Sequence, residues 1–89
     1  MSETNIDNTL EQRGNNYGNF KGQALVSQNI KAAMHNSLNW GNLPPEMKEA
    51  LEMMAHKTAR ILNGDPNFHD SWHHIIGYVR LIEKILVKD

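Results

Sequence analysis

The segment from residue 70 to residue 87 limits the folds open to this chain more than any other part of its sequence. On a helix, where each residue turns by about 100°, its apolar side chains cover more than half of the circumference. They are Trp72, Ile75, Ile76, Tyr78, Val79, Leu81, Ile82, Ile85 and Leu86. A helix with so wide an apolar arc needs two packing partners. We expect a second subunit to supply one of them, and the alternative is a central helix wrapped by its own chain.

The small size of the chain limits the interactions that can stabilise its fold. Its 89 residues correspond to one domain with a small core. It contains no cysteine, so neither disulfides nor thiolate zinc sites can support the fold. The absence of cysteine also fits a reducing cytoplasm. We therefore expect packing, a histidine and carboxylate metal site, or oligomerisation to provide the stability, and we favour a homo-oligomer.

The charge and hydropathy of the chain exclude two kinds of partner. Nine Lys and Arg stand against ten Asp and Glu, for a formal net charge of -1. The chain therefore lacks the basic surface with which proteins hold duplex nucleic acid. Its first residues are polar, without the apolar segment of a signal peptide. Its apolar runs are only a few residues long, so we expect no membrane-spanning helix and no membrane partner.

The sequence predicts an all-α fold, a small helical bundle of three main helices plus a short N-terminal helix. The main helices are expected at residues 23–38, 45–63 and 70–87. Pro45 suits the first turn of the second helix, and Gly64 is its expected C-cap residue. Asp70 is the expected N-cap of the third.

The N-terminal part, residues 1–22, is treated as a short helix near residues 7–13 followed by a Gly- and Asn-rich loop, and residues 23–89 as the helical domain proper. Glycine and asparagine favour turns and positive φ angles. The loop also carries Tyr17 and Phe20. These aromatic side chains either plug the edge of the core or line a pocket.

Carboxylates at three-residue spacing suggest one type of chemistry. Glu46, Glu49 and Glu52 repeat at this spacing, and Asp70 and His73 form a second pair. Two such pairs on facing helices can hold magnesium through oxygen ligands. The pattern resembles the all-α nucleotide pyrophosphohydrolases of the MazG and dUTPase-like type, which implies a metal site of Glu49, Glu52, Asp70 and His73. Their second pair is typically Glu-x-x-Asp, and the alternative is a solvated surface with a helix cap.

A basic pair suggests a different chemistry. Lys57 and Arg60 lie one helical turn apart and can hold one phosphate together. The alternative is an interaction of both cations with the helix dipole. Gly77, inside the last predicted helix, is expected to allow close approach of a helix or a ligand. Trp72 and Tyr78 beside it could stack on a base or pack in a core or interface.

Four motifs carry a resemblance that covers most of the chain after residue 12. They are Arg13-x-x-x-Tyr17-Gly18-x-Phe20, Glu49-Ala50-Leu51-x-Met53, His56-Lys57-x-Ala59-Arg60-Ile61-Leu62-x-Gly64-Asp65-Pro66 and Asp70-Ser71-Trp72-x-x-Ile75-x-Gly77-Tyr78. Together they resemble a family of short phage and prophage proteins of unknown function. They are also similar to the nucleotide-modification-associated domains of phages. The family usually has an acidic residue where this chain has His74. The histidine therefore leaves a metal site with one carboxylate fewer than the family would provide.

The resemblance implies a phage-encoded protein of the bacterial cytoplasm with a nucleotide-related role. We expect a non-catalytic nucleotide binder, without a cofactor, that could sequester a host immune signalling nucleotide. Arg60 and Lys57 would hold phosphate, and Arg13 is a further expected ligand-binding residue. Tyr17 or Trp72 would stack on the base, and Asp70 would orient the loop or accept a ribose hydroxyl. The alternatives are the magnesium-dependent pyrophosphohydrolase and an inhibitor that binds a host protein through an exposed helix face.

Overall fold

The computed structural model describes residues 2–87, and this part of the chain is all-α, as the sequence predicts. Its helices are α1 (Ser2–Tyr17), α2 (Phe20–His35), α3 (Pro45–Asn63) and α4 (His69–Leu86), with the short 3₁₀ helix η1 (Trp40–Asn42) between α2 and α3. None of the helices described is long and apolar enough to cross a membrane.

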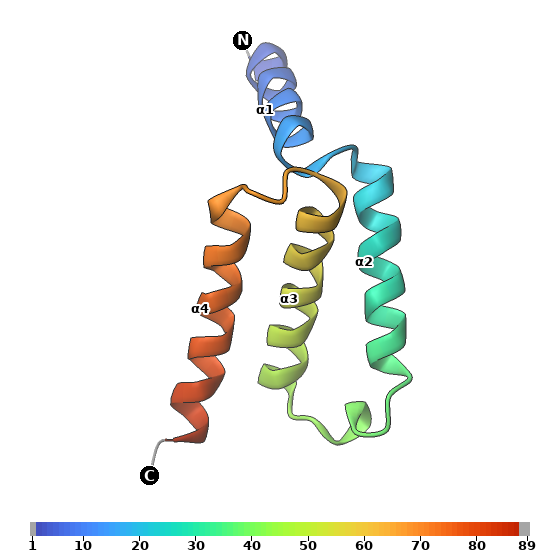
Figure 1. Cartoon of the computed structure of the whole chain (residues 1–89), viewed down its shortest axis with the longest axis vertical. Helices are drawn as coiled ribbons and strands as arrows, with labels where there is room; N and C mark the ends of the chain where they lie inside the picture. The colour runs from blue at the N-terminus through green and yellow to red at the C-terminus, as the bar shows by residue number, and fades with distance from the viewer. Residues whose placement is uncertain (1, 88–89) are drawn as a thin grey trace.

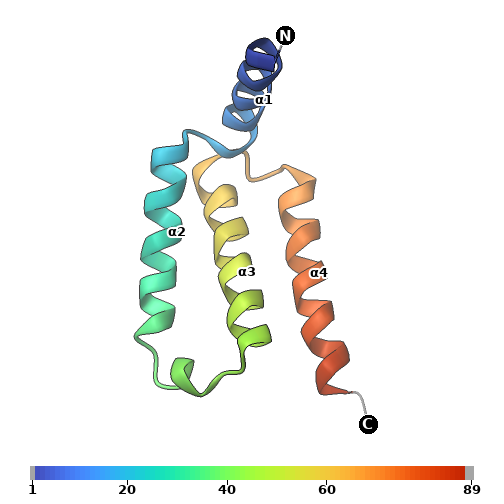
Figure 2. The same ribbon diagram turned by 180° about the vertical axis from the view of Figure 1, so that it is seen from behind.

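The three long helices after α1 lie side by side in one layer. Helix α3 is in the middle, with α2 and α4 on either side, and α1 extends beyond one end of the layer (Figure 1). The view from behind shows the same order (Figure 2). We expected a bundle, in which each helix packs on two others. In the layer only α3 does so, and α4 packs against α3 alone among the long helices.

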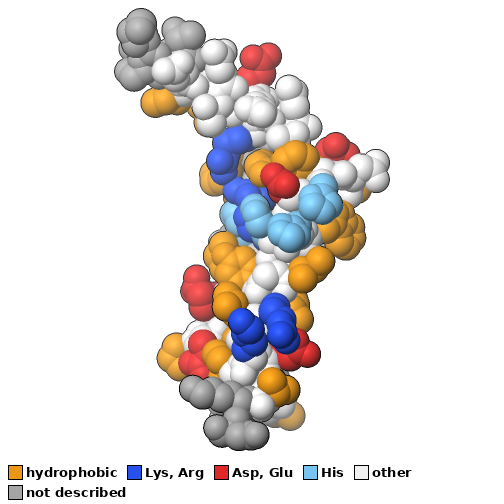
Figure 3. Space-filling view, turned by 90° about the vertical axis from the view of Figure 1, so that its left-hand side faces the viewer, with side chains coloured by type: hydrophobic (Ala, Val, Ile, Leu, Met, Phe, Trp, Pro, Cys, Tyr) orange, Lys and Arg blue, Asp and Glu red, His pale blue; other side chains and the backbone are white. Residues whose placement is uncertain are grey.

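The buried apolar core is correspondingly small. In the described chain it consists of Ala50, Ala55, Ala59 and Ile61, all on α3. Alanine side chains let neighbouring helices approach closely but bury little surface, so each contributes little hydrophobic free energy. With α4 toward the viewer, hydrophobic side chains are visible on both flanks of the helix, while histidines gather toward its N-terminal half (Figure 3). The layer thus leaves much of its apolar surface uncovered.

The expected short N-terminal helix and long loop are wrong. Helix α1 continues through Gly14 to Tyr17, and α2 begins at Phe20, so only Gly18 and Asn19 connect them. A glycine inside a helix costs about 1 kcal/mol relative to alanine, which the surrounding turns can offset. The turn falls instead at Gly18, the one residue with positive φ (78°) in the described chain. Asn19 then caps α2, since its side chain accepts a hydrogen bond from the Gly22 amide at 2.7 Å.

The two predicted caps of α3 and α4 have different outcomes. Gly64 is the C-cap of α3, as predicted, although its φ of -128° is not left-handed. Asp70 is not the N-cap of α4. That position belongs to Phe68, whose side chain makes no capping hydrogen bond, and Asp70 lies in the first turn. There its carboxylate still interacts favourably with the helix dipole.

Gly77 does not mark a close approach within this chain, contrary to our expectation. A Cβ atom at Gly77 would have no other atom within 4 Å. Gly77→Ala is therefore expected to stabilise the protein by about 1 kcal/mol, which raises the melting temperature by roughly 4–8 °C in a domain of this size. Thermal unfolding followed by circular dichroism measures the change. A lower melting temperature would show that another surface covers Gly77.

Candidate functional site

A cleft of about 440 Å³ opens where α1, α2 and α3 meet. Its walls come from the C-terminal turns of α1, the start of α2 and the C-terminal half of α3. The lining residues are Leu10, Arg13, Gly14, Tyr17, Gly18, Asn19, Phe20, Gln23, His56 and Arg60. We call it the α1–α3 cleft. Its volume lies in the usual range for small-molecule sites, which is roughly 300–1,000 Å³.

A set of close backbone approaches fixes this cleft. The Asn63 side-chain amide donates hydrogen bonds to the carbonyl oxygens of Tyr17 and Asn19, each at 2.9 Å. A Cβ at Gly18 would lie 2.2 Å from the Asn63 carbonyl oxygen, and one at Gly64 would lie 2.3 Å from the backbone of Tyr17. Only glycine permits these approaches. The turn between α1 and α2 is therefore held against the end of α3, one helical turn beyond Arg60.

Tyr17 organises the two arginines of the cleft. The guanidinium carbon of Arg60 lies 4.2 Å from the centre of the Tyr17 ring, and that of Arg13 lies 5.7 Å from it. Both distances are in the range of cation–π contacts. The Phe68 ring meets Tyr17 edge-on, with centroids 5.7 Å apart. These contacts show that Tyr17 positions Arg60, whereas stacking of the Tyr17 ring on a base stays a prediction.

Phe20 is the aromatic side chain of the cleft that remains open. It lines the same cleft and is 76% exposed. An apolar ring this exposed at the first residue of a helix contributes little to stability. It offers a flat surface of the kind on which a nucleobase stacks, worth about 1–3 kcal/mol per base in single-stranded nucleic-acid sites.

The cations in the cleft and beside it have no carboxylate partner in the described chain. The ion pairs among residues 5–87 are His35 with Glu52, His69 with Asp70 and Arg80 with Glu83. Arg13, Lys57 and Arg60 take part in none of them. The Nε atom of Arg60 is also shielded from solvent and has no hydrogen-bond partner within this part of the structure. A buried donor without a partner costs about 1–3 kcal/mol, which a bound acceptor would recover.

The electrostatic state of the α3 residues reflects this crowding of positive charge. Burial, reinforced by Arg60, Lys31, Lys57 and Arg13, lowers the pKa of His56. Burial, reinforced by Arg60 and Arg13, likewise lowers the pKa of Lys57.

The pKa of Arg60 is shifted in the same direction. Burial lowers its pKa; Tyr17 opposes this shift, and Arg13 adds to it. For every one of these groups the folded protein disfavours the protonated form, and a bound anion would favour it.

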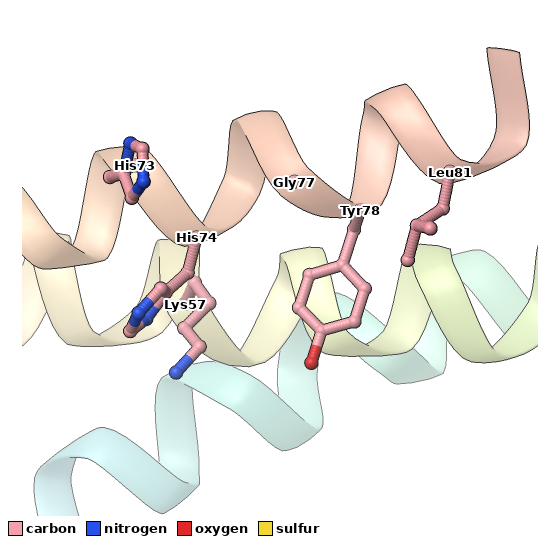
Figure 4. Close-up of a pocket in the computed structure, with 6 residues that line it drawn as sticks. All are labelled: Lys57, His73, His74, Gly77, Tyr78 and Leu81. Atoms are coloured by element: carbon pink, nitrogen blue, oxygen red, sulfur yellow. The ribbon is translucent and has the colours of Figure 1, made fainter. Parts of the chain in front are cut away.

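Lys57 lies beside the cleft rather than in its wall. It lines a shallower depression of about 560 Å³ between α3 and α4, together with His74, Tyr78 and Leu81. The side chains of Lys57, His74 and Tyr78 extend in the same direction in Figure 4, whereas His73 is turned away from them. Lys57 is nevertheless close enough to Arg60 and Arg13 to share their electrostatic field.

Asp70 and Trp72 do not line the cleft. The Trp72 indole N–H donates to the Pro66 carbonyl oxygen at 2.7 Å, which fixes the loop before α4. The Asp70 carboxylate is exposed and lies 3.8 Å from His69. Of the six predicted ligand-binding residues, the structure thus brings together Arg13, Tyr17 and Arg60, places Lys57 next to them, and leaves Asp70 and Trp72 elsewhere.

The alternative metal site is not assembled in the described chain. Within residues 5–87, no group of three histidine or carboxylate side chains could hold one ion, so Glu49, Glu52, Asp70 and His73 do not converge. The Glu52 carboxylate is 2.7 Å from the His35 Nε2 atom. Of the three glutamates in the stripe on α3, Glu52 therefore supplies an interaction with α2.

Sequence reasoning overlooked His56 as a member of the site. It stands four residues before Arg60, and residues at this spacing share one face of a helix. That spacing was the available signal.

Comparison of the chain with protein-family models, with curated proteins and with solved structures finds no match in any of the three.

Proposed function

We propose that this protein binds a phosphate-bearing nucleotide in the α1–α3 cleft without converting it. One observation carries the proposal: Arg60 and Arg13 converge on Tyr17 with no carboxylate partner in the described chain, and the Nε atom of Arg60 lacks a hydrogen-bond partner. Folding places these charges close together at a cost in free energy. A phosphate would accept hydrogen bonds from the guanidinium groups and remove that cost.

The rest of the cleft suits the remainder of a nucleotide. Phe20 and Leu10 provide apolar surface, and Gln23, which is buried, provides an amide that can donate and accept hydrogen bonds. The cleft thus offers groups that bind phosphate, base and sugar, and no metal site is assembled among the described residues. The biological role that we propose is sequestration of a host signalling nucleotide, which is the role expected from the phage-like motifs of the sequence.

Native mass spectrometry tests this function directly. The protein is incubated with a panel of nucleosides, nucleoside mono-, di- and triphosphates, cyclic mononucleotides and cyclic dinucleotides. We expect the protein to gain the mass of a phosphate-bearing compound, and denaturation to release that compound unchanged. The corresponding nucleoside should not bind. If no phosphate-bearing compound binds, the proposal is wrong, and a released product of altered mass would indicate an enzyme.

The pH dependence of binding gives a prediction about His56. Burial, reinforced by Arg60 and Lys57 on α3, Lys31 on α2 and Arg13 on α1, keeps the pKa of His56 below the ordinary value of 6.5. A bound phosphate would oppose this shift, so binding should take up a proton. Affinity for a phosphodiester, whose charge is constant in this range, should therefore rise as the pH falls from about 7.5 to about 5.5, by up to tenfold per unit of pKa shift.

Calorimetric titration at several pH values measures this effect. His56→Gln keeps a polar side chain but cannot titrate, so its affinity should be nearly independent of pH. The stability of the unliganded protein should change with pH in the opposite direction to the affinity. Because the folded state disfavours charged His56, its stability should decline as the pH falls below 6.5. A wild-type affinity that does not change with pH would exclude His56 from the site.

A further inference from the structure

One side of the helix layer carries an apolar groove that is separate from the α1–α3 cleft. The groove runs between α3 and α4 and has a volume of about 450 Å³. Its lining is hydrophobic except for one glutamate: Met47, Ala50, Leu51, Met54, Val79, Ile82, Glu83, Leu86 and Val87. Glu83 is paired with Arg80. The groove is therefore not suited to a charged ligand.

The groove belongs to a larger apolar face. On α4, Trp72, Val79 and Leu86 recur every seven residues and share one side of the helix. On α3, Leu62 lies about three turns after Leu51 and extends the same stripe. These five side chains are between 38% and 67% exposed. We call the side of the layer that they form the apolar face.

The cationic residues lie on the opposite side of the layer. Leu62 follows Arg60 by two residues and therefore points about 200° away from it around α3. Leu81 is related to Val79 in the same way on α4, and it lines the depression that contains Lys57. The apolar face and the candidate nucleotide site can thus be occupied independently.

The solvent-accessible surface area of the chain is larger than that expected for a compact monomer of the same mass. A folded monomer of 10.2 kDa is expected to expose about 5,300 Å², but this chain exposes 6592 Å². The radius of gyration is 15.4 Å, where about 12 Å is expected for this length. Part of the excess belongs to α1, which extends beyond the layer. The total of about 1,300 Å² exceeds the roughly 800 Å² that each partner buries in a standard stable interface.

We infer that a second copy of this chain packs on the apolar face and forms a two-layer homodimer. The groove between α3 and α4 would receive the ridge of exposed side chains on the partner's equivalent helices, as in ridges-into-grooves packing. Met47 and Met54 in the groove suit such a contact because methionine adapts to the shape of its neighbour. Two-fold symmetry pairs this face with itself, and the net charge of -1 opposes association only weakly. This inference does not depend on the proposed function.

The molar mass of two matched variants of the whole chain tests the dimer. Val79→Glu places a charge in the groove, and Leu81→Glu places one on the opposite side of the same helix. The two residues are 49% and 59% exposed. By light scattering after size exclusion, we expect wild type and Leu81→Glu to have twice the chain mass of 10.2 kDa and Val79→Glu to have that of one chain. Dissociation of Leu81→Glu but not Val79→Glu would overturn the inference.

A second measurement covers the case in which Val79→Glu does not fold. The melting temperature of a wild-type dimer rises with protein concentration, because association stabilises only the folded chain. Leu62→Glu, at a residue that is 67% exposed, should lower the melting temperature at a given concentration and abolish this dependence. A wild-type protein with the mass of one chain and a melting temperature independent of concentration would overturn the dimer. It would leave another protein as the occupant of the groove, and nucleotide binding would remain a separate question.

Discussion

Gly18→Ala is expected to lower the melting temperature by more than about 10 °C. Gly18 has a φ of 78°, where an alanine costs roughly 1–2 kcal/mol. Its Cβ would also lie 2.2 Å from the Asn63 carbonyl oxygen, so α1 and α3 would have to separate. Displacing packed backbone adds about 1–3 kcal/mol. A domain of this size has a total stability of only about 5–10 kcal/mol.

Gly14→Ala provides the matched control for this change. Gly14 lies one turn earlier in α1, and a Cβ atom there would have no neighbour within 4 Å. Because alanine is the better helix former, Gly14→Ala should stabilise the protein by roughly 0.5–1 kcal/mol. Thermal or urea unfolding of the two variants measures the difference. If both variants were equally stable, the close approach of α1 to α3 at Asn63 would not exist in solution.

Hydrophobic periodicity was sufficient to predict that three long helices form, but not the bounds of the first. The helix expected at residues 23–38 begins and ends three residues later than α2, which spans Phe20–His35. The expected helix at residues 45–63 matches α3, because Pro45 and Gly64 mark its ends unambiguously. The expected helix at 70–87 differs from α4 by one residue at each end. Periodicity failed at the N-terminus, where α1 has few apolar residues, and several glycines were equal candidates for the turn. Only the contacts with Asn63, far away in the sequence, distinguish Gly18 from Gly14.

The candidate site was predictable to the extent that its residues share one helix face. Lys57 and Arg60 were recognised from their spacing on α3, and the structure adds His56 from the same helix. The contribution of α1 could be anticipated only through the motif that contains Arg13 and Tyr17. Trp72 was assigned to the site as a ring that could stack on a base, and Asp70 as a carboxylate that would orient the loop or accept a ribose hydroxyl. The loop after Gly64 instead directs α4 to the side of α3 away from α2 (Figure 1).

The arrangement of the layer could not be derived from helix patterns. The apolar arc of α4 predicts two partners, and the structure provides one within the chain. A pattern on one helix shows how much surface must be covered but not which surface covers it. The exposed side of α4 that carries Trp72, Val79 and Leu86 is the surface on which we propose that a second copy of the chain packs.

Arg60→Gln is expected to weaken nucleotide binding by about 10- to 100-fold, since hydrogen bonds to a charged group contribute roughly 1.5–3 kcal/mol. The same substitution should leave the stability of the free protein unchanged or slightly higher, because it removes a partly buried cation whose Nε atom has no partner in the described structure. Lower affinity without lower stability is the pattern expected of a binding residue rather than a structural one. Calorimetric titration and thermal unfolding of the same preparations measure both quantities.

The control for Arg60→Gln is Arg80→Gln, which removes the same charge at a distance from the cleft. Arg80 is exposed on α4 and already pairs with Glu83, so its loss should change nucleotide affinity less than about twofold. Arg60→Lys separates charge from shape, because lysine keeps the charge but lacks the planar group that lies over Tyr17. We expect its affinity to be intermediate. Equal affinities for wild type, Arg60→Gln and Arg80→Gln would exclude the α1–α3 cleft as the nucleotide site, whatever the oligomeric state of the protein.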